Sequence, residues 1–242
     1  MNAVLVLVKR GQVGLRRIHE SETIGFFRTF VVPPGSGPVY ASHGGRLAGV
    51  EFELVPWEVQ GLLGRLLEPS EGVVDLESFR SKSSPVAKLL AAADQGIRLA
   101  DLKTLVRGPV VRSKAACSQV IHAWTRLSAT WGRILVRDLA WELGWSERYF
   151  QKRFVAETRL RPVFVARHFR FAAARHLLES SKQPIADIAA QTGFADQAHL
   201  NREAKRLLGV TPSFIRVVRF ADLPGTPAPR SSSDLFKTRR CP

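Results

Sequence analysis

Val136-Arg-Asp-Leu-Ala-Trp-Glu-Leu-Gly-Trp-Ser146 and Ile185-Ala-Asp-Ile-Ala-Ala-Gln-Thr-Gly-Phe-Ala195 are two copies of one sequence pattern, and their first residues lie 49 positions apart. An aspartate, the apolar residue after it, an alanine, a glycine and an aromatic residue recur in the same order. The second copy then gains one residue, so that Phe150 matches Leu200 and Pro162 matches Pro212 at a spacing of 50. The C-terminal half of the chain therefore contains an internal duplication.

Each copy has the residues that two helices joined by a sharp turn require. Gly144 or Gly193 ends the first helix, because glycine adopts positive φ without steric cost. Ser146 or Asp196 can then cap a second helix. The residues expected to be buried on the second helices are Tyr149, Phe150, Phe154, Leu200 and Ala204. This is the helix-turn-helix pattern, in which the second helix enters the major groove of DNA.

A long helix is predicted between the two copies. It is opened by Pro162 and covers Val163–Glu179. At a rise of about 1.5 Å per residue, this helix is roughly 25 Å long. A stiff element of that length can hold two recognition helices near one turn of B-DNA apart, which is about 34 Å. We therefore expect one chain to recognise two successive major-groove segments.

Positive charge is concentrated in the same part of the chain. The formal net charge is +15. Residues 112–220 contain 19 Lys and Arg against 8 Asp and Glu, whereas residues 1–111 contain 13 against 11. Such a balance indicates a polyanionic partner, either nucleic acid or an acidic membrane surface. Because phosphate binding needs positive charge on one surface, the local excess favours nucleic acid.

The first half of the chain has a different pattern, made of short extended segments. Val4–Val8, Phe26–Val32 and Leu47–Leu54 are β-branched, aromatic or alternating runs. Helices are expected from Pro56 and from near Pro85. The predicted fold class is α+β. A small β-rich N-terminal domain is followed by an all-α domain, in which two helix-turn-helix units are joined by a long helix.

Composition also predicts the limits of the domains. Residues 1–105 are expected to form a sensor or dimerisation domain, and residues 106–117, which include the helix-stopping pair Gly108-Pro109, a linker. The DNA-binding domain is expected over residues 118–220. Residues 221–242 are polar and contain several prolines, so a disordered tail is predicted there.

The C-terminal motifs resemble the AraC/XylS family of bacterial transcription regulators over roughly residues 118–219. The resemblance depends on the runs Leu139-Ala140…Gly144-Trp145-Ser146, Arg170-Phe171…Ala174-Arg175…Leu177-Leu178, Ile188-Ala189…Gly193-Phe194 and Leu208-Gly209-Val210-Thr211-Pro212-Ser213…Arg216. Two positions depart from the family pattern, because Arg159 stands in place of a glycine and Ala204 in place of an aromatic residue. Residues 45–79 look like the end of the small β-rich N-terminal domain of some members. The region before them is short for a full β-barrel sensor.

The candidate DNA contacts lie on the two second helices, where the resemblance places the base-recognising positions of the family. Arginine can pair with guanine, and glutamine or asparagine with adenine. Base contacts are expected from Arg148, Gln151, Lys152, Gln197, His199, Asn201 and Arg202. Phosphate contacts are expected from Arg153, Lys205 and Arg206. The alternative for all ten is that they are merely solvated.

Several neighbours of these contacts have other expected roles. Glu203 would repel phosphate, so it should point away from DNA or pair with a neighbouring residue. Arg170 and Arg175 lie on the long helix, where internal salt bridges are favoured over phosphate contacts. Trp124, Trp131 and Trp141 are expected in the core.

The sequence thus predicts a DNA-binding transcriptional regulator that recognises specific sequences and has no enzymatic activity. The alternative is a sequence-independent architectural DNA-binding protein. An alkyl-accepting enzyme is a further rival, but it needs a reactive cysteine in a basic setting, and neither Cys117 nor Cys241 has one in the sequence. The scattered histidines show no metal-ligand spacing, so no metal and no cofactor is expected.

The expected partners follow from the same interpretation. Double-stranded DNA is the main one, with RNA polymerase, a small-molecule effector and a second copy of the chain as the others. No membrane partner is expected, because no apolar run approaches 18–20 residues. The low cysteine count is typical of a reducing cytoplasm, which is the predicted location.

Overall fold

The computed structural model describes residues 2–17, 23–37, 39–45, 47–80, 85–95, 99–107 and 116–217. The chain divides into two compact units, one of Met1–Thr125 with Val136–Phe164 and the other of Arg126–Leu135 with Val165–Pro242. The predicted tail at 221–242 and most of the predicted linker lie outside the described residues. The domain limits drawn from the sequence stay a prediction.

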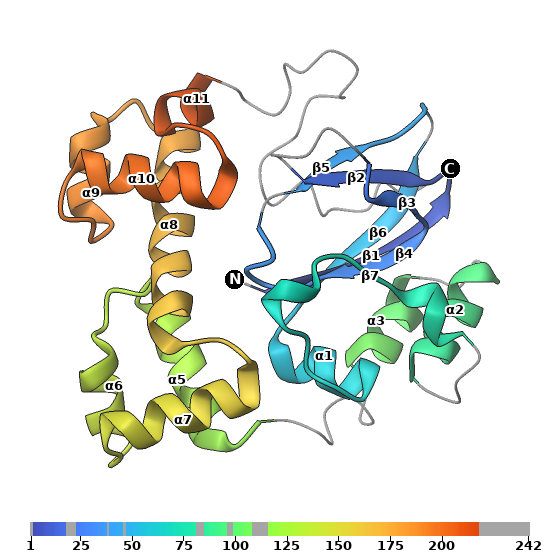
Figure 1. The fold of residues 1–242 in the computed structure, drawn as a ribbon, viewed down its shortest axis with the longest axis horizontal. Coiled ribbons are helices and arrows are strands. Elements are labelled where there is room, and N and C mark those ends of the chain that lie inside the picture. The colour runs from blue at the N-terminus through green and yellow to red at the C-terminus, as the bar shows by residue number, and fades with distance from the viewer. Residues whose placement is uncertain are drawn as a thin grey trace. The chain divides into compact units, whose positions relative to one another are not determined.

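A four-stranded antiparallel sheet lies at the centre of the N-terminal region (Figure 1). Its strands are β1 (Ala3–Arg10), β4 (Thr29–Val32), β6 (Ala48–Leu54) and β7 (Val74–Asp75), in the order β6-β1-β4-β7. Burial alternates along β1, as expected for a strand that covers a core. The apolar run at the start of the chain is therefore the second strand of this sheet, as its composition indicated.

A second sheet of three antiparallel strands packs on one face of the first. It consists of β2 (Val13–Arg17), β3 (Gly25–Phe27) and β5 (Val39–Ser42), in the order β3-β2-β5. The run expected to be one extended segment over residues 26–32 is divided at Arg28, so that its two halves belong to different sheets. Val8, Val13, Leu15 and Phe30 form the buried cluster shared by the two sheets.

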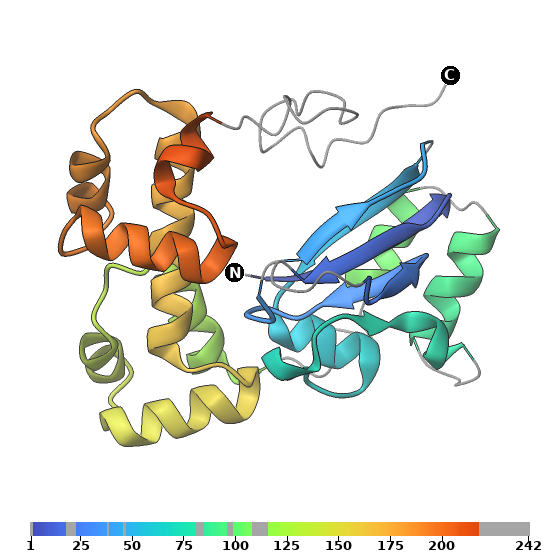
Figure 2. The same ribbon diagram turned by 45° about the horizontal axis from the view of Figure 1, so that its top comes forward.

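Helices cover the other face of the first sheet, as Figures 1 and 2 show. They are α1 (Pro56–Leu63), α2 (Pro85–Asp94) and α3 (Leu99–Arg107), with 3₁₀ turns at Pro69–Glu71 and Leu76–Phe79. Leu5, Leu54, Leu62, Leu89 and Leu102 are fully buried in the cluster between these helices and the sheet. The layers are therefore helix, sheet and sheet.

The C-terminal part is helical throughout its described length. Its helices are α5 (Ser118–Ala129), α6 (Val136–Glu142), α7 (Glu147–Thr158), α8 (Pro162–Ser180), α9 (Ile185–Gln191), α10 (Gln197–Leu208) and α11 (Pro212–Val217). The long helix predicted between the repeats is α8, and Pro162 is its first residue. Two helix pairs joined by a long helix follow a β-rich region, so the predicted α+β fold class is confirmed.

An aromatic stack connects α1, α5 and α7 in the first unit. The rings of Trp57 and Trp124 meet edge to face with centroids 5.7 Å apart, and Trp124 stacks on Phe154 at 6.1 Å. Phe154 in turn contacts Phe150, and both phenylalanines are fully buried. Trp124 is thus a core residue, as expected.

The other two tryptophans expected in the core are exposed, and that prediction is wrong. Trp141 is 83% exposed and Trp131 is 50% exposed. Helix α6 has only seven residues, and its buried side holds Leu139 and Ala140, so the next position turns outward. Trp131 lies in the loop after α5 with φ of +52°.

Glu51 on β6 provides a prediction about pH. The pKa of Glu51 is raised to about 7, mainly by burial of the carboxyl group and to a smaller extent by the charge of Glu53. The folded state therefore holds this proton at pH values where the unfolded chain, with a glutamate pKa of about 4.3, has lost it. Stability is expected to fall as the pH rises from about 4 to about 7. Glu51→Gln should remove that fall and stabilise the protein at pH 8 by about 1–2 kcal/mol, allowing for partial exposure of the group. Urea denaturation at several pH values measures this, and an equally steep slope in both proteins would contradict it.

Candidate nucleic-acid interface

The duplicated sequence folds into two copies of one local geometry. Gly144 and Gly193 end α6 and α9 with φ of +67° and +79°. The aromatic residue after each glycine donates its backbone N–H to the alanine carbonyl five residues earlier, Trp145 to Ala140 and Phe194 to Ala189, at 2.9 Å in both copies. Each turn therefore has the same backbone closure, and the glycines end the first helices at positive φ, as the repeat predicted.

Matching caps start the second helices, α7 and α10. The Ser146 hydroxyl accepts from the N–H of Tyr149 at 3.3 Å, and Asp196 accepts from that of His199 at 2.5 Å. The capped residues also contact the corner aromatics edge to face, with Tyr149 5.1 Å from Trp145 and His199 5.2 Å from Phe194. Tyr149 is 48% exposed, so its predicted burial is wrong, because Phe150 and Phe154 occupy the inner face.

The outer surface of α7 carries three of the predicted contacts. Arg148, Gln151 and Lys152 are exposed, and the side chains of Phe150 and Phe154 hold the opposite face in the core. The Gln151 amide donates to Glu147 at 3.0 Å, one turn earlier on the helix. A cation, an amide and a second cation therefore project from two turns of this helix.

Arg153, on the side of α7, already has a protein partner. Its guanidinium pairs with Glu157 at 2.5 Å, one turn later on the helix. The other carboxylate oxygen of Glu157 accepts from the backbone N–H of Cys117 at 2.7 Å. The contact of Glu157 with Cys117 holds the segment before α5 against α7. The spacing of residues in the sequence did not indicate this contact.

Helix α10 presents an equivalent surface in the second unit. Gln197, Arg202, Lys205 and Arg206 are exposed, whereas His199 and Asn201 are half-buried. The Nδ1 atom of His199 accepts from the N–H of Ala195 at 3.4 Å. In the neutral ring the proton then lies on Nε2, which is left as a donor.

A buried carboxylate holds α10 against α8. Glu203 is 5% exposed and pairs with Arg167 of α8 at 3.0 Å and with Arg206 at 2.8 Å. Burial lowers the pKa of Arg167, and Glu203 opposes that effect. Glu203 thus pairs with its neighbours, as expected from the repulsion that a phosphate would exert on it.

Further contacts of α8 are internal to the second unit. Arg170 donates to the carbonyl oxygen of Gly193 at 3.3 Å, at the turn between α9 and α10. Arg175 pairs with Glu179 at 2.7 Å on the helix itself. Both arginines therefore make contacts within the protein, as the sequence favoured, although Arg170 binds a carbonyl group and no carboxylate.

Residues 139–217 match the family model described as "Helix-turn-helix domain". The match spans both repeated units and α8. The C-terminal region contains an AraC-type helix-turn-helix domain. This agrees with the resemblance of the motifs, and domains of this kind bind DNA in transcription regulators.

Several solved structures of AraC-family proteins are similar to the chain. The C-terminal domain of AraT, a response regulator from Geobacillus stearothermophilus, has 22% identity over 42% of this chain and 86% of its own, with a TM-score of 0.40. A probable AraC family transcriptional regulator from Rhodopseudomonas palustris CGA009 has 24% identity over 41% of this chain and 94% of its own chain, with a TM-score of 0.38. ToxT from Vibrio cholerae O395 has 14% identity over 89% of this chain and 88% of its own chain, with a TM-score of 0.47. No curated protein matches the chain significantly.

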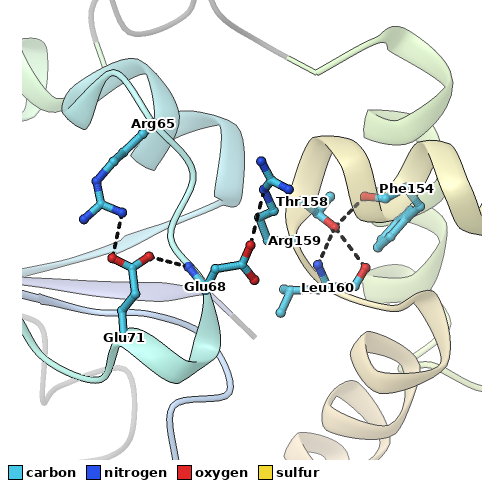
Figure 3. Close-up of polar contacts among 7 residues, drawn as sticks. All are labelled: Arg65, Glu68, Glu71, Phe154, Thr158, Arg159 and Leu160. Carbon is cyan, nitrogen blue, oxygen red and sulfur yellow. Dashed lines mark hydrogen bonds and ion pairs between the residues drawn. The ribbon is translucent and has the colours of Figure 1, made fainter.

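The first unit of the AraC-type domain ends in an unusual cap, shown in Figure 3. Arg159, after the last residue of α7, has φ of +59° and donates its backbone N–H to the Val155 carbonyl at 2.8 Å. Gly209 has the same place after α10, with φ of +72°. The Arg159 guanidinium lies 3.5 Å from Glu68, which precedes the 3₁₀ turn at Pro69–Glu71. The departure from the family pattern thus preserves the left-handed cap.

Arg159→Gly is expected to stabilise the protein by about 0.5–1 kcal/mol. Glycine removes the cost of the left-handed conformation, about 1 kcal/mol or more for other residues. The lost pair with Glu68 is worth less, because both side chains are about half exposed. Arg159→Ala is the matched control, since it loses the pair and keeps the strain. Thermal unfolding measures both variants, and a loss of stability in the glycine variant would contradict the prediction.

The described residues contain no group of three or more His, Cys, Asp or Glu residues placed to hold a metal ion. None of the helices in the described ranges is both long enough and apolar enough to cross a membrane.

Proposed function

We propose that this protein is a sequence-specific transcription regulator that inserts α7 and α10 into the major groove of DNA. The observation that supports this most directly is the repeated geometry of the two units. In each, a capped second helix lies after a left-handed glycine and turns a cationic and amide-bearing face to solvent. Helices of this kind are the recognition helices of helix-turn-helix proteins.

The exposed side chains divide by chemistry into two proposed roles. Base contacts are assigned to Arg148, Gln151, Lys152, Gln197, His199, Asn201 and Arg202. Their amide, imidazole and cationic groups match the donor and acceptor patterns of base edges. Phosphate contacts are assigned to Arg153, Lys205 and Arg206. The pairs of Arg153 with Glu157 and of Arg206 with Glu203 would orient these guanidinium groups and reduce their net charge.

The length of α8 supports recognition of two DNA segments by one chain. The helix is continuous over 19 residues, Pro162–Ser180. At about 1.5 Å per residue it is roughly 28 Å long, comparable with the 34 Å turn of B-DNA. Selection of bound fragments from random DNA tests this directly. The expected result is two short motifs about one helical turn apart, and a single motif would contradict recognition by both units.

The alternative function is sequence-independent, architectural DNA binding. Gel-shift titrations at about 150 mM salt with a selected duplex and a scrambled duplex distinguish the two functions. A sequence-specific regulator should prefer the selected duplex by about 10³-fold or more. Equal affinity for the two duplexes would favour the architectural alternative.

Substitutions at base and phosphate positions are expected to have different signatures. Arg148→Ala and Arg202→Ala should each weaken binding to the selected duplex by about 1–3 kcal/mol and leave the scrambled duplex much less affected. Lys205→Ala should weaken binding to both duplexes equally. It should also reduce the magnitude of the slope of log K against log salt concentration by about one. Fluorescence anisotropy at several salt concentrations measures both effects. Equal losses on both duplexes for the two arginine variants would contradict their assignment to bases.

The remaining partners stay predictions that follow from this function. A regulator of transcription is expected to contact RNA polymerase, to respond to a small-molecule effector through its N-terminal region and to form a homodimer in the cytoplasm. Co-purification with polymerase and the molar mass in solution are the corresponding measurements.

A further inference from the structure

We propose that Tyr149 of α7 is a further DNA contact, the counterpart in the first unit of His199 in the second. Each residue offers one neutral hydrogen-bond donor to the duplex, the hydroxyl of Tyr149 or the Nε2–H of His199. This role rests on the proposed function, because α7 and α10 are taken as the helices that meet DNA. The sequence pattern placed Tyr149 in the core, so it was not among the expected contacts.

Tyr149 and His199 occupy the same place in the two repeats. Each is the third residue of its helix, and their positions differ by the spacing of 50 that relates the second helices of the two units. The next residue in each copy, Phe150 or Leu200, is fully buried. Because successive residues of a helix point about 100° apart, Tyr149 and His199 lie on the flank of the helix, beside the core.

Equivalent contacts hold the two residues. The backbone N–H of each is bonded to the side chain that caps its helix. The rings of Tyr149 and Trp145 meet edge to face, with centroids 5.1 Å apart and an interplanar angle of 89°. The rings of His199 and Phe194 meet in the same way, at 5.2 Å and 84°. Two chemically different side chains therefore have one orientation relative to the turn.

The polar end of each ring is available to a ligand. Tyr149 is 48% exposed, and none of the residues in the described ranges forms a hydrogen bond with its hydroxyl. The Nδ1 atom of His199 accepts from the N–H of Ala195, so the proton of the neutral ring lies on Nε2. A ring that packing already holds in place loses little conformational freedom when its polar end binds.

Both residues lie beside the helix face that is proposed to contact bases. The cation three positions later, Lys152 or Arg202, is a neighbour on the same side of the helix. The aromatic residue that each ring contacts belongs to the turn after the first helix of the unit, and in helix-turn-helix proteins this first helix crosses the DNA backbone. A donor at this place faces a phosphate that borders the groove or the edge of a base. Removal of the donor distinguishes the two acceptors.

Tyr149→Phe removes the donor and keeps the ring. Binding to the selected duplex is expected to weaken about fivefold or more, as for the loss of one hydrogen bond. An equal loss on the scrambled duplex identifies a phosphate as the acceptor, and a loss confined to the selected duplex identifies a base. The slope of log K against log salt concentration should not change, because a neutral donor releases no counterion. Fluorescence anisotropy measures both quantities.

Tyr40→Phe is the matched control. The sequence contains two tyrosines, and Tyr40 of β5 is 47% exposed, almost the same fraction as Tyr149. Its loss of a hydroxyl should leave DNA affinity unchanged, and both variants should unfold at the temperature of the unmodified protein. Unchanged affinity in Tyr149→Phe, or an equal loss in Tyr40→Phe, would overturn the proposal.

Two substitutions of His199 separate its donor from its other contacts. His199→Asn places an amide oxygen near Nδ1, where it can accept from Ala195, and leaves no donor near Nε2. His199→Gln places an amide group near Nε2 and so retains a donor there. The asparagine variant is expected to bind the selected duplex about fivefold more weakly than the glutamine variant. Equal affinities would refute the equivalence of His199 and Tyr149.

Fluorine NMR on the chain labelled with fluorotyrosine observes the two tyrosines directly. The two phenylalanine variants assign the resonances of Tyr40 and Tyr149. A saturating amount of the selected duplex should shift the Tyr149 resonance and leave the Tyr40 resonance in place. A Tyr149 resonance that does not move would overturn the contact.

The proposed function and this contact fail separately. Equal affinity of the protein for the selected and scrambled duplexes, with both weakened by Tyr149→Phe, would refute sequence-specific regulation and keep the contact. A clear preference for the selected duplex that Tyr149→Phe leaves unchanged in strength would refute the contact alone.

Discussion

Gly132→Ala is expected to destabilise the protein by about 3–5 kcal/mol, the largest effect of a single methyl group that the structure indicates. Gly132 lies in the loop between α5 and α6 with φ of +68°. A Cβ atom there would overlap the Ala166 carbonyl oxygen and lie 2.6 Å from its carbonyl carbon. Both are backbone atoms of α8, so no side-chain rotation can relieve the overlap, and the loop or the helix must move.

Gly144→Ala is the control that separates crowding from backbone strain. Gly144 has φ of +67°, and a Cβ atom there would meet nothing within 4 Å. Its loss should be limited to the conformational cost, about 1 kcal/mol. Urea denaturation of both variants measures the difference. Equal losses would show that the contact of Gly132 with α8 has no energetic weight.

Glu203→Ala is expected to destabilise the second unit by about 2–4 kcal/mol. The carboxylate is buried and pairs with Arg167 and Arg206. Removing one member of a buried ion pair leaves the other charge without compensation, and this costs more than the pair contributes. The same change releases α10 from α8, so DNA affinity should fall together with stability. Glu203→Gln should lose less, because the amide oxygen can still accept from an arginine.

Glu179→Ala is the matched control for that prediction. Glu179 pairs with Arg175 at 2.7 Å, but both side chains are partly exposed. The expected loss is about 0.5 kcal/mol or less, with DNA affinity unchanged. Thermal unfolding and anisotropy titrations on the four proteins measure both quantities. A loss at Glu203 no larger than that at Glu179 would refute the role of burial.

The local features of the DNA-binding domain were predictable because short-range chemistry specifies them. Glycine at a left-handed position, Ser146 or Asp196 at a helix start and Pro162 at a first turn each act through their nearest neighbours in the chain. Duplication made the signal stronger, since the same residues recur at a fixed spacing. Trp141 corresponds to Ala190 in the second unit, and that difference was the available sign that the position is exposed.

The sequence by itself thus determined two helix-turn-helix units, the helix between them and the charge of the region, because each depends on residues within a few turns of one another. Tertiary structure alone decided that Arg159 reaches Glu68 and that Glu203 binds Arg167. Those residues are brought together by strand register and helix packing, which depend on the burial of many distant side chains at once. No local pattern encodes such proximity.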